Sequence, residues 1–309
     1  MGELMTIEQA LYEADADKVE AITRLVTDTV ESPHTKRAYA RAIRDFLAWY
    51  RETGQVGLNK ALVVHYAATL RAEGLGAASI NQRLSAIRKL AQEAADNEVL
   101  GQSTANGIKN VRGVKQQGQR MGFWLARDQA QALLDAPDTA TLKGLRDRAM
   151  LAVMLGCGLR RSEVAGLTFA HIQRRDGRWV VVDLVGKGNR TRSVVMPKWA
   201  KDAIDAWVEA AGLTEGLVFR AIKCGGRVQD AISADGVAYV VKQYGRALGF
   251  ENLAAHDLRR TYAKLARKGG ADLEQIQINL GHASLTTTER YLGTALDLEA
   301  APCDALGLS

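Results

Sequence analysis

Hydrophobic side chains recur at helical spacing through the first third of the chain. The pattern predicts five helices, which cover residues 7–30, 32–53, 59–71, a stretch from 78 onward, and 104–110. Ser32 followed by Pro33 is a typical helix start. Residues 111–122 lose all periodicity and contain three glycines, which predicts a linker. The first part of the chain is therefore expected to be helical up to this linker.

The rest of the chain alternates helical patterns with β-branched runs. Helices are predicted over 125–134, 143–155, 201–211, 233–248, 256–268, 273–280 and 286–292. Residues 178–185 and 190–196 flank the glycine-rich sequence Gly186-Lys187-Gly188-Asn189, which predicts an antiparallel hairpin. Residues 217–222 are a candidate third strand. The fold class predicted from these patterns is mainly α with a small antiparallel β-sheet.

The length of 309 residues and the hydrophobic content of 47% predict two domains with sizeable cores. We expect an acidic helical segment at 1–30, a helical domain at 31–110, the linker at 111–122, and a second domain with a C-terminal tail at 123–309. No apolar run is as long as a bilayer span, and MGELMTIEQA lacks a signal-peptide pattern. These features predict a cytoplasmic protein without a membrane partner.

Several kinds of site have no support in the sequence. The three cysteines are widely spaced and fit neither a disulfide framework nor a set of metal ligands. The chain lacks a carboxylate cluster of the kind that a two-metal nuclease uses, and it lacks a Walker-type glycine loop. We therefore expect no metal and no cofactor.

The net charge of +6 is unevenly distributed. Residues 1–30 carry two basic and seven acidic side chains, whereas residues 31–120 carry 14 basic and seven acidic ones. This excess predicts that the helical domain binds a polyanion such as double-stranded DNA, although solvated helix faces would look the same. The candidate contacts are Lys36, Arg37, Arg41, Arg44, Asn81, Arg83, Arg88 and Lys89, with Lys115 in the linker and Lys242 and Arg246 in the second domain.

A set of reactive side chains is spread over the second domain. His256 and Arg259 lie three positions apart on a predicted helix and so share a face. Arg160 follows a glycine-broken helix end, where it can reach a phosphate or form a salt bridge with Glu163. The other members are Lys187 in the hairpin turn, His282 and Tyr291. Each motif is common alone, but together they suit phosphodiester cleavage, with arginines on the phosphate, a lysine and histidines moving protons, and a phenol attacking.

The order of these motifs resembles that of tyrosine recombinases, the family of phage integrases and Xer-type resolvases. The motifs are GLRRSEVAGL, VGKGNRTRSVVMP, HDLRRTYA and LGHASLTTTERYLG. The likeness covers residues 123–295 and continues more weakly into SPHTKRAYARAIRDFLAWY. It implies a two-domain clamp, with a helical core-binding domain and a mixed α/β catalytic domain. It also implies site-specific recombination through a 3′-phosphotyrosyl intermediate, in integration, excision or resolution of a mobile element or replicon.

The resemblance also implies a role for each residue. Tyr291 would attack the phosphate, Arg160 and Arg259 would clamp its oxygens, and His282 would add a further donor. His256 would act as general base and Lys187 as general acid. Glu163 would orient the cluster.

The expected partners follow from the same resemblance. Leucines in the tail after Tyr291 leave an apolar surface, and in the family such a tail docks on a neighbouring protomer, which implies a homo-oligomer, a tetramer, on DNA. Accessory DNA-bending or directionality proteins are further candidates, and the site of action would be the bacterial cell or nucleoid. Two alternatives remain open from the residues, namely a type IB topoisomerase-like relaxing enzyme and a non-catalytic DNA-binding regulator derived from a recombinase.

Overall fold

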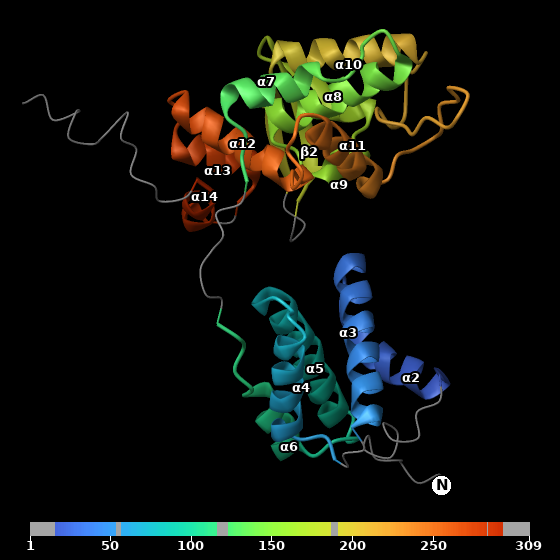
Figure 1. Ribbon diagram of the computed structural model, residues 1–309, viewed down its shortest axis with the longest axis vertical. Coiled ribbons are helices and arrows are strands. Elements are labelled where there is room, and N and C mark those ends of the chain that lie inside the picture. The colour runs from blue at the N-terminus through green and yellow to red at the C-terminus, as the bar shows by residue number, and fades with distance from the viewer. Residues whose placement is uncertain (1–15, 54–56, 116–122, 187–190, 283, 293–309) are drawn as a thin grey trace, which may run out of the picture. The chain divides into compact units, whose positions relative to one another are not determined.

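The computed structural model describes residues 16–53, 57–115, 123–186, 191–282 and 284–292 (Figure 1). The chain divides into two compact units, residues 1–119 and 120–309. This division falls inside the predicted linker. Among the described ranges, no helix combines the length and apolar character that a membrane crossing requires.

The first unit is a helical bundle. Its described helices are α2 (Ala16–Thr27), α3 (Pro33–Glu52), α4 (Lys60–Ala72), α5 (Ala77–Asp96) and α6 (Gln102–Lys109). The side chains of Ser32 and Asn59 accept hydrogen bonds from the backbone N–H groups of Thr35 and Leu62, so the predicted start signals cap α3 and α4. The apolar stripes of these helices meet in one core. Helix α2 packs against α3 and α5, so the described part of the acidic segment belongs to this bundle.

The start of the predicted linker is bound to the bundle. Val111 is buried in the core and Val114 packs against it. The Asn81 side chain donates to the carbonyl of Val114 at 2.9 Å and accepts from its N–H at 2.8 Å. Arg88 donates to the carbonyl of Val111. Residues 111–114 therefore form part of the first unit, because two valines supply apolar contacts that the neighbouring glycines obscured in the sequence pattern.

The four candidate DNA contacts on α5 already have partners within the first unit. Arg83 is largely buried and donates to Asp45 at 2.9 Å, and Arg88 is partly buried against Val111. The side chain of Asn81 is hydrogen-bonded to the backbone of Val114, and Lys89 forms a salt bridge with Glu93 at 2.6 Å. Among the candidates of the first unit, the exposed cations are Arg37, Arg41, Arg44 and Lys115, with Lys36 half-buried. Their contact with DNA stays a prediction.

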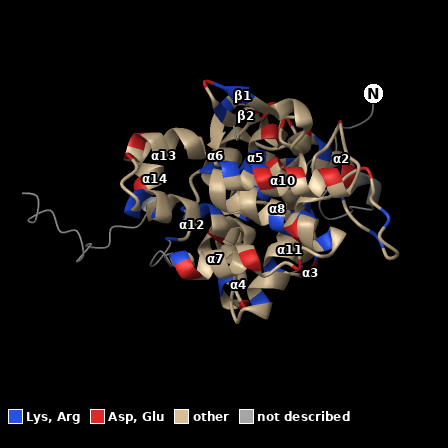
Figure 2. Cartoon of the chain, turned by 90° about the horizontal axis from the view of Figure 1, so that it is seen from above, with Lys and Arg blue, Asp and Glu red and all other residues tan. Residues whose placement is uncertain are grey.

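The second unit surrounds a central helix. Its helices are α7 (Arg127–Asp135), α8 (Leu142–Cys157), α9 (Arg161–Ala165), the 3-10 turn η1 (Phe169–His171), α10 (Lys198–Ala210), α11 (Ala234–Ala247), α12 (Ala255–Lys268), α13 (Leu273–Leu280) and α14 (Leu285–Leu292). Helix α8 is buried along most of its length and packs against α7, α10 and α12 (Figure 1). Acidic residues mark the outer face of α10 (Figure 2), where Asp202 and Asp205 pair with lysines one turn away.

The sheet confirms two predicted strands and overturns the third. Strands β1 (Ile172–Arg175), β2 (Arg178–Val185) and β3 (Thr191–Met196) form an antiparallel sheet in the order β1-β2-β3. Residues 217–222 are not a strand, because their ends form only isolated bridges, Leu217 with Thr168 and Ile222 with Val228. Strand β1 is polar and mostly exposed, which hid it from a hydrophobic pattern. Its signal was the turn Asp176-Gly177, where both residues have positive φ, the conformation of a two-residue hairpin.

The bidentate contact of Asn81 generates a stability prediction. Replacing Asn81 with alanine leaves the N–H and carbonyl of Val114 without this partner, and we expect the unfolding free energy to fall by about 1–2 kcal/mol. Urea unfolding of the full chain, followed by circular dichroism, measures the change. Gln82→Ala, an exposed position on the same helix, is the matched control and should have little effect. Equal losses in the two variants would refute the structural role of Asn81.

Candidate active site

Arg160 is placed by the junction between α8 and α9. Helix α8 ends at Gly158, whose φ of 63° suits glycine, and a Cβ there would lie 2.8 Å from the ring of Tyr262. The chain then turns so that Arg160 is the N-cap residue of α9. Its backbone N–H donates to Glu163 Oε2 at 2.8 Å, and its guanidinium donates to Glu163 Oε1 at 2.6 Å. The salt bridge considered from the sequence is present, and the Arg160 side chain stays 28% exposed.

Arg192 is a member of this cluster that sequence reasoning missed. Its guanidinium donates to both oxygens of Glu163, at 2.9 and 2.8 Å, and its Nε donates to the carbonyl of Asn279 at 2.8 Å. A signal for it was present in β3, where Arg192 alternates with Val194 and Met196 on the buried face. An arginine at an inward-facing position has to be paired, because an unpaired buried charge is costly.

The charge state of Glu163 follows from these contacts. Burial raises its pKa, but the hydrogen bonds and positive charges of Arg192 and Arg160 outweigh burial and bring the pKa down to about 2. Glu163 is therefore ionised at neutral pH. Its carboxylate accepts hydrogen bonds from the guanidiniums of Arg160 and Arg192.

Arg259 joins the ends of two other helices. It lies on α12, is only 1% exposed, and donates from Nη1 to the carbonyl of Gly158 at 2.6 Å. Its Nη2 donates to the carbonyl of Leu280, the last residue of α13. Carbonyls at helix C-termini lack intrahelical partners and carry partial negative charge, so a guanidinium is a favourable partner. Arg259 is thus fixed at the point where α8, α12 and α13 converge.

The two histidines lie within the field of these arginines. Partial burial, the largest cause, acts together with the positive charges of Arg259 and Arg160 to lower the pKa of His282 to about 4. Loss of solvent around the imidazole also lowers the pKa of His256, with help from the charges of Arg260 and Arg259. Both imidazoles are therefore neutral at pH 7 in the absence of a bound anion. These shared electrostatic effects show that the predicted Arg160, His256, Arg259 and His282 lie close together.

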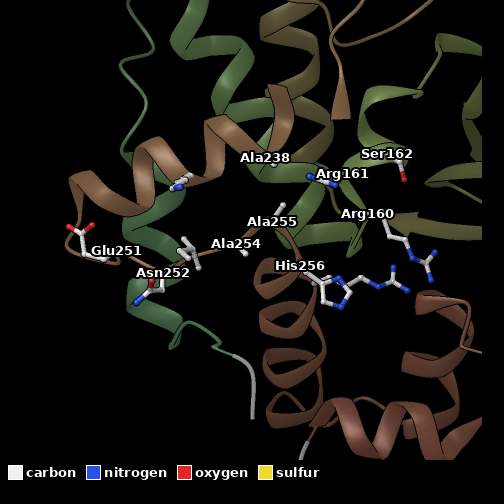
Figure 3. Close-up of a pocket in the computed structure, with 12 residues that line it drawn as sticks. Arg160, Arg161, Ser162, Ala238, Glu251, Asn252, Ala254, Ala255 and His256 are labelled. Atoms are coloured by element: carbon white, nitrogen blue, oxygen red, sulfur yellow. The ribbon is translucent and has the colours of Figure 1, made fainter. Parts of the chain in front are cut away.

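A cavity of about 620 Å³ opens beside this cluster. Figure 3 shows Arg160 and His256 extending into it from different elements. The residues that line it are Arg160, Arg161, Ser162, Ala238, Lys242, Glu251, Asn252, Leu253, Ala254, Ala255, His256 and Arg259. Lys242 therefore faces the cavity as a candidate contact, whereas Arg246 does not line it and lies 3.8 Å from Glu251. The wall is rich in cationic donors and suits a phosphate group.

The structure does not describe the side chains of two predicted catalytic residues. Lys187 lies outside the described residues, and so does the side chain of Tyr291. The backbone of Tyr291 belongs to α14. His282 Nδ1 lies 3.0 Å from the hydroxyl oxygen of Thr288, which is a buried residue of α14. Hence the cationic cluster is connected to the helix that carries the tyrosine.

Gly281 generates a prediction for the packing of the cluster. It ends α13 with a φ of 60°, and a Cβ there would lie 2.8 Å from Cδ of Arg192. The control is Gly212, whose φ of 64° is similar but whose added Cβ would meet no atom within 4 Å. We expect Gly212→Ala to cost about 1–2 kcal/mol of unfolding free energy from backbone strain, and Gly281→Ala to cost about 1–3 kcal/mol more because Arg192 is displaced. Urea unfolding compares them, and equal costs would contradict the close approach.

The lowered pKa of His282 predicts a pH dependence of stability. The unfolded chain binds a proton at about pH 6.5, whereas the folded chain binds it only near pH 4. Between these values the unfolded state holds more protons, so the unfolding free energy rises with pH and falls as pH drops. An NMR titration should show an imidazole with a midpoint near 4 that is absent from His282→Gln. A midpoint at or above 6.5 would show that burial and the arginine charges together do not lower the pKa of this ring.

Comparisons with known proteins agree with this geometry. The chain matches the phage integrase family over residues 124–296 and the phage integrase N-terminal SAM-like domain over 22–98. It is 33% identical over 279 residues to the tyrosine recombinase XerC of Pelobacter propionicus, covering 88% of this chain and 89% of that protein. It is 32% identical over 275 residues to XerC of Shigella flexneri, covering 87% of each.

Solved structures share the fold. XerH site-specific recombinase bound to palindromic difH substrate, in a post-cleavage complex, superposes with a TM-score of 0.71 at 18% identity, covering 92% of this chain and 82% of that one. A lambda integrase dimer bound to a COC′ core site superposes with a TM-score of 0.67 at 17% identity, covering 90% and 96%. The family match spans the whole cationic cluster and α14, so the chain belongs to the phage integrase family and is a tyrosine site-specific recombinase.

Proposed function

We propose that Tyr291 is the nucleophile that cleaves one strand of a specific DNA duplex at the phosphate held by Arg160, Arg259 and His282. The phenolic oxygen forms a bond to phosphorus while the bond from phosphorus to the 5′ oxygen breaks. The products are a 3′-phosphotyrosine and a 5′-hydroxyl end. The same steps in reverse, with a different 5′-hydroxyl, rejoin the strands. The observation that supports this most is the arginine cluster, which is connected through His282 and Thr288 to the helix carrying Tyr291.

Arg160 and Arg259 would stabilise the charge that develops on the non-bridging oxygens. Arg259 is held by two backbone carbonyls and Arg160 by Glu163, so neither guanidinium has to be ordered when DNA arrives. Preorganised donors of this kind contribute more to a transition state than mobile ones, because no reorganisation is needed during the reaction. His282 would add a further hydrogen bond to the same oxygens.

Proton transfer would be shared between two groups. His256 is neutral at pH 7 and can accept the phenolic proton from Tyr291 as the new bond forms. Lys187 would supply a proton to the leaving 5′ oxygen, which otherwise departs as a poor alkoxide leaving group. Both assignments rest on the resemblance of HDLRRTYA and VGKGNRTRSVVMP to the family motifs.

The partners proposed for the enzyme are DNA and further copies of the chain. Exposed cations of the helical unit, among them Arg41 and Arg44, would contact phosphates, with Lys242 adding a contact at the cavity. The structural neighbours include a lambda integrase dimer on DNA, which supports assembly on the substrate. A tetramer joined by the C-terminal tail, and accessory bending or directionality proteins, extend this proposal. Acting on DNA, the enzyme would reside in the bacterial cytoplasm.

Replacing Tyr291 with phenylalanine tests the nucleophile. We expect Tyr291→Phe to lose all covalent adduct, because the attacking oxygen is gone, while DNA affinity is retained. The assay detects a denaturation-resistant protein–DNA band on nicked duplexes that the wild-type enzyme has enriched from a randomised pool. Tyr239→Phe, which removes an exposed hydroxyl in the same unit, is the control and should form adduct normally.

Two outcomes would overturn the proposal. Adduct formed by Tyr291→Phe would assign the nucleophile elsewhere. Relaxation of arbitrary supercoiled plasmids by the wild-type enzyme, without recombinant products, would favour a topoisomerase over a recombinase.

A further inference from the structure

We propose that Arg192 is a positioning residue of the active site, which fixes Arg160 through the carboxylate of Glu163 and fixes the segment before His282 through the carbonyl of Asn279. The inference rests on the proposed function, because it takes Arg160 and His282 as contacts of the reacting phosphate. It adds a residue that is neither nucleophile, acid, base nor phosphate ligand.

The first line of support is the geometry around Glu163. Each carboxylate oxygen accepts one hydrogen bond from Arg192 and one from Arg160. The fork of Arg192 fixes the plane of the carboxylate, since both of its terminal nitrogens bind, at 2.9 and 2.8 Å. The orientation of the carboxylate then sets where the guanidinium of Arg160 lies. Without the fork, Glu163 can rotate about its last torsion and carry Arg160 with it.

The second line of support is burial. The side chains of Arg192 and Glu163 are only 7% and 6% exposed, whereas that of Arg160 is 28% exposed. Arg160 lines the cavity, and Arg192 does not. A phosphate in the cavity therefore meets Arg160 directly, while Arg192 acts from behind Glu163.

The third line of support lies on the other side of the guanidinium. Nε of Arg192 donates to the carbonyl of Asn279, in the last turn of α13. Gly281 follows, and its missing side chain lets the Arg192 stem approach, since a Cβ there would lie 2.8 Å from Cδ. His282 comes directly after this glycine. One guanidinium thus ties β3 to the start of α9 and to the end of α13, which present Arg160 and His282.

Stability alone does not account for this arrangement. A buried ion pair is often no more stabilising than apolar residues of the same volume, because removing two charges from water is costly. Strand β3 already places Val194 and Met196 in the core beside Arg192. A methionine at the position would fill similar space, but it lacks the three directed donors that Arg192 uses. A lysine would keep the charge but lose the fork.

The test is a double-mutant cycle on the rate of adduct formation. Arg192→Met, Glu163→Gln and the double variant are compared with the wild-type full chain, using nicked duplexes enriched by the wild-type enzyme. Single-turnover rates are measured at saturating enzyme, and DNA dissociation constants are measured separately. The matched control is Arg146→Met. Arg146 is also buried, at 6% exposed, and donates to a buried carboxylate, Asp147, and to a backbone carbonyl, but it lies outside the cavity wall.

We expect Arg192→Met to lower the saturated rate on the order of a hundredfold, the scale that a small misplacement of a reacting group produces, with DNA affinity unchanged. In the Glu163→Gln background the same substitution should cost less than in the wild type, because the path from Arg192 to Arg160 is already broken and only the contact with Asn279 remains to be lost. Arg146→Met should have the same effect in both backgrounds. Arg192→Lys should restore only part of the rate.

Several results would overturn the inference. One is that the rate penalties of Arg192→Met and Glu163→Gln multiply in the double variant. Another is a full single-turnover rate for Arg192→Lys. The last is that Arg192→Met lowers only the DNA affinity or the folded fraction and leaves the saturated rate unchanged. Failure of the wild-type enzyme to form a Tyr291 adduct would instead overturn the proposed function. The two failures are therefore distinguishable.

Discussion

The site depends on one carboxylate. Glu163 accepts hydrogen bonds from two guanidiniums and one backbone N–H, and its pKa of about 2 keeps it charged wherever the protein is folded at neutral pH. Without this charge, the guanidiniums of Arg160 and Arg192 would repel each other, because partial burial leaves little solvent to screen their charges. With it, Arg192 is a buried support, while Arg160 stays partly exposed at the cavity, where we propose that it binds the phosphate. The cations of this site are thus organised by an anion that does not line the cavity.

Several helices near Glu163 contribute their ends to the site. Arg160 caps the start of α9, Arg259 binds carbonyls at the ends of α8 and α13, and His282 follows the glycine that ends α13. Helix termini offer backbone groups without partners, so side chains with several donors or acceptors can join them. Gly158 and Gly281 make the close approach of these ends feasible. Core packing of α8 therefore has a direct consequence for chemistry, since it sets where the ends meet.

The sequence indicated the parts of this arrangement that depend on local spacing. The three-residue step from His256 to Arg259 placed both on α12, and valine-rich residues 178–185 form β2 as expected. The failures involve distant partners. Arg192 meets Glu163 across 29 positions and Asn279 across 87, and Asn81 meets Val114 across 33, so no local pattern identifies these pairs. Strand β1 was missed because it is polar and exposed, although its Asp176-Gly177 turn was readable.

The charge distribution also relates binding to proton transfer. The arginines lower the pKa values of His256 and His282, which means that a proton on either imidazole is disfavoured while the cavity holds no anion. By the same interaction, an anion that offsets the arginines makes each imidazole a better proton acceptor. The coupling is reciprocal, so a proton on His256 also strengthens the hold on the phosphate. With His256 as the proposed general base, this coupling would favour proton removal from Tyr291 in the DNA complex over proton removal in the free enzyme.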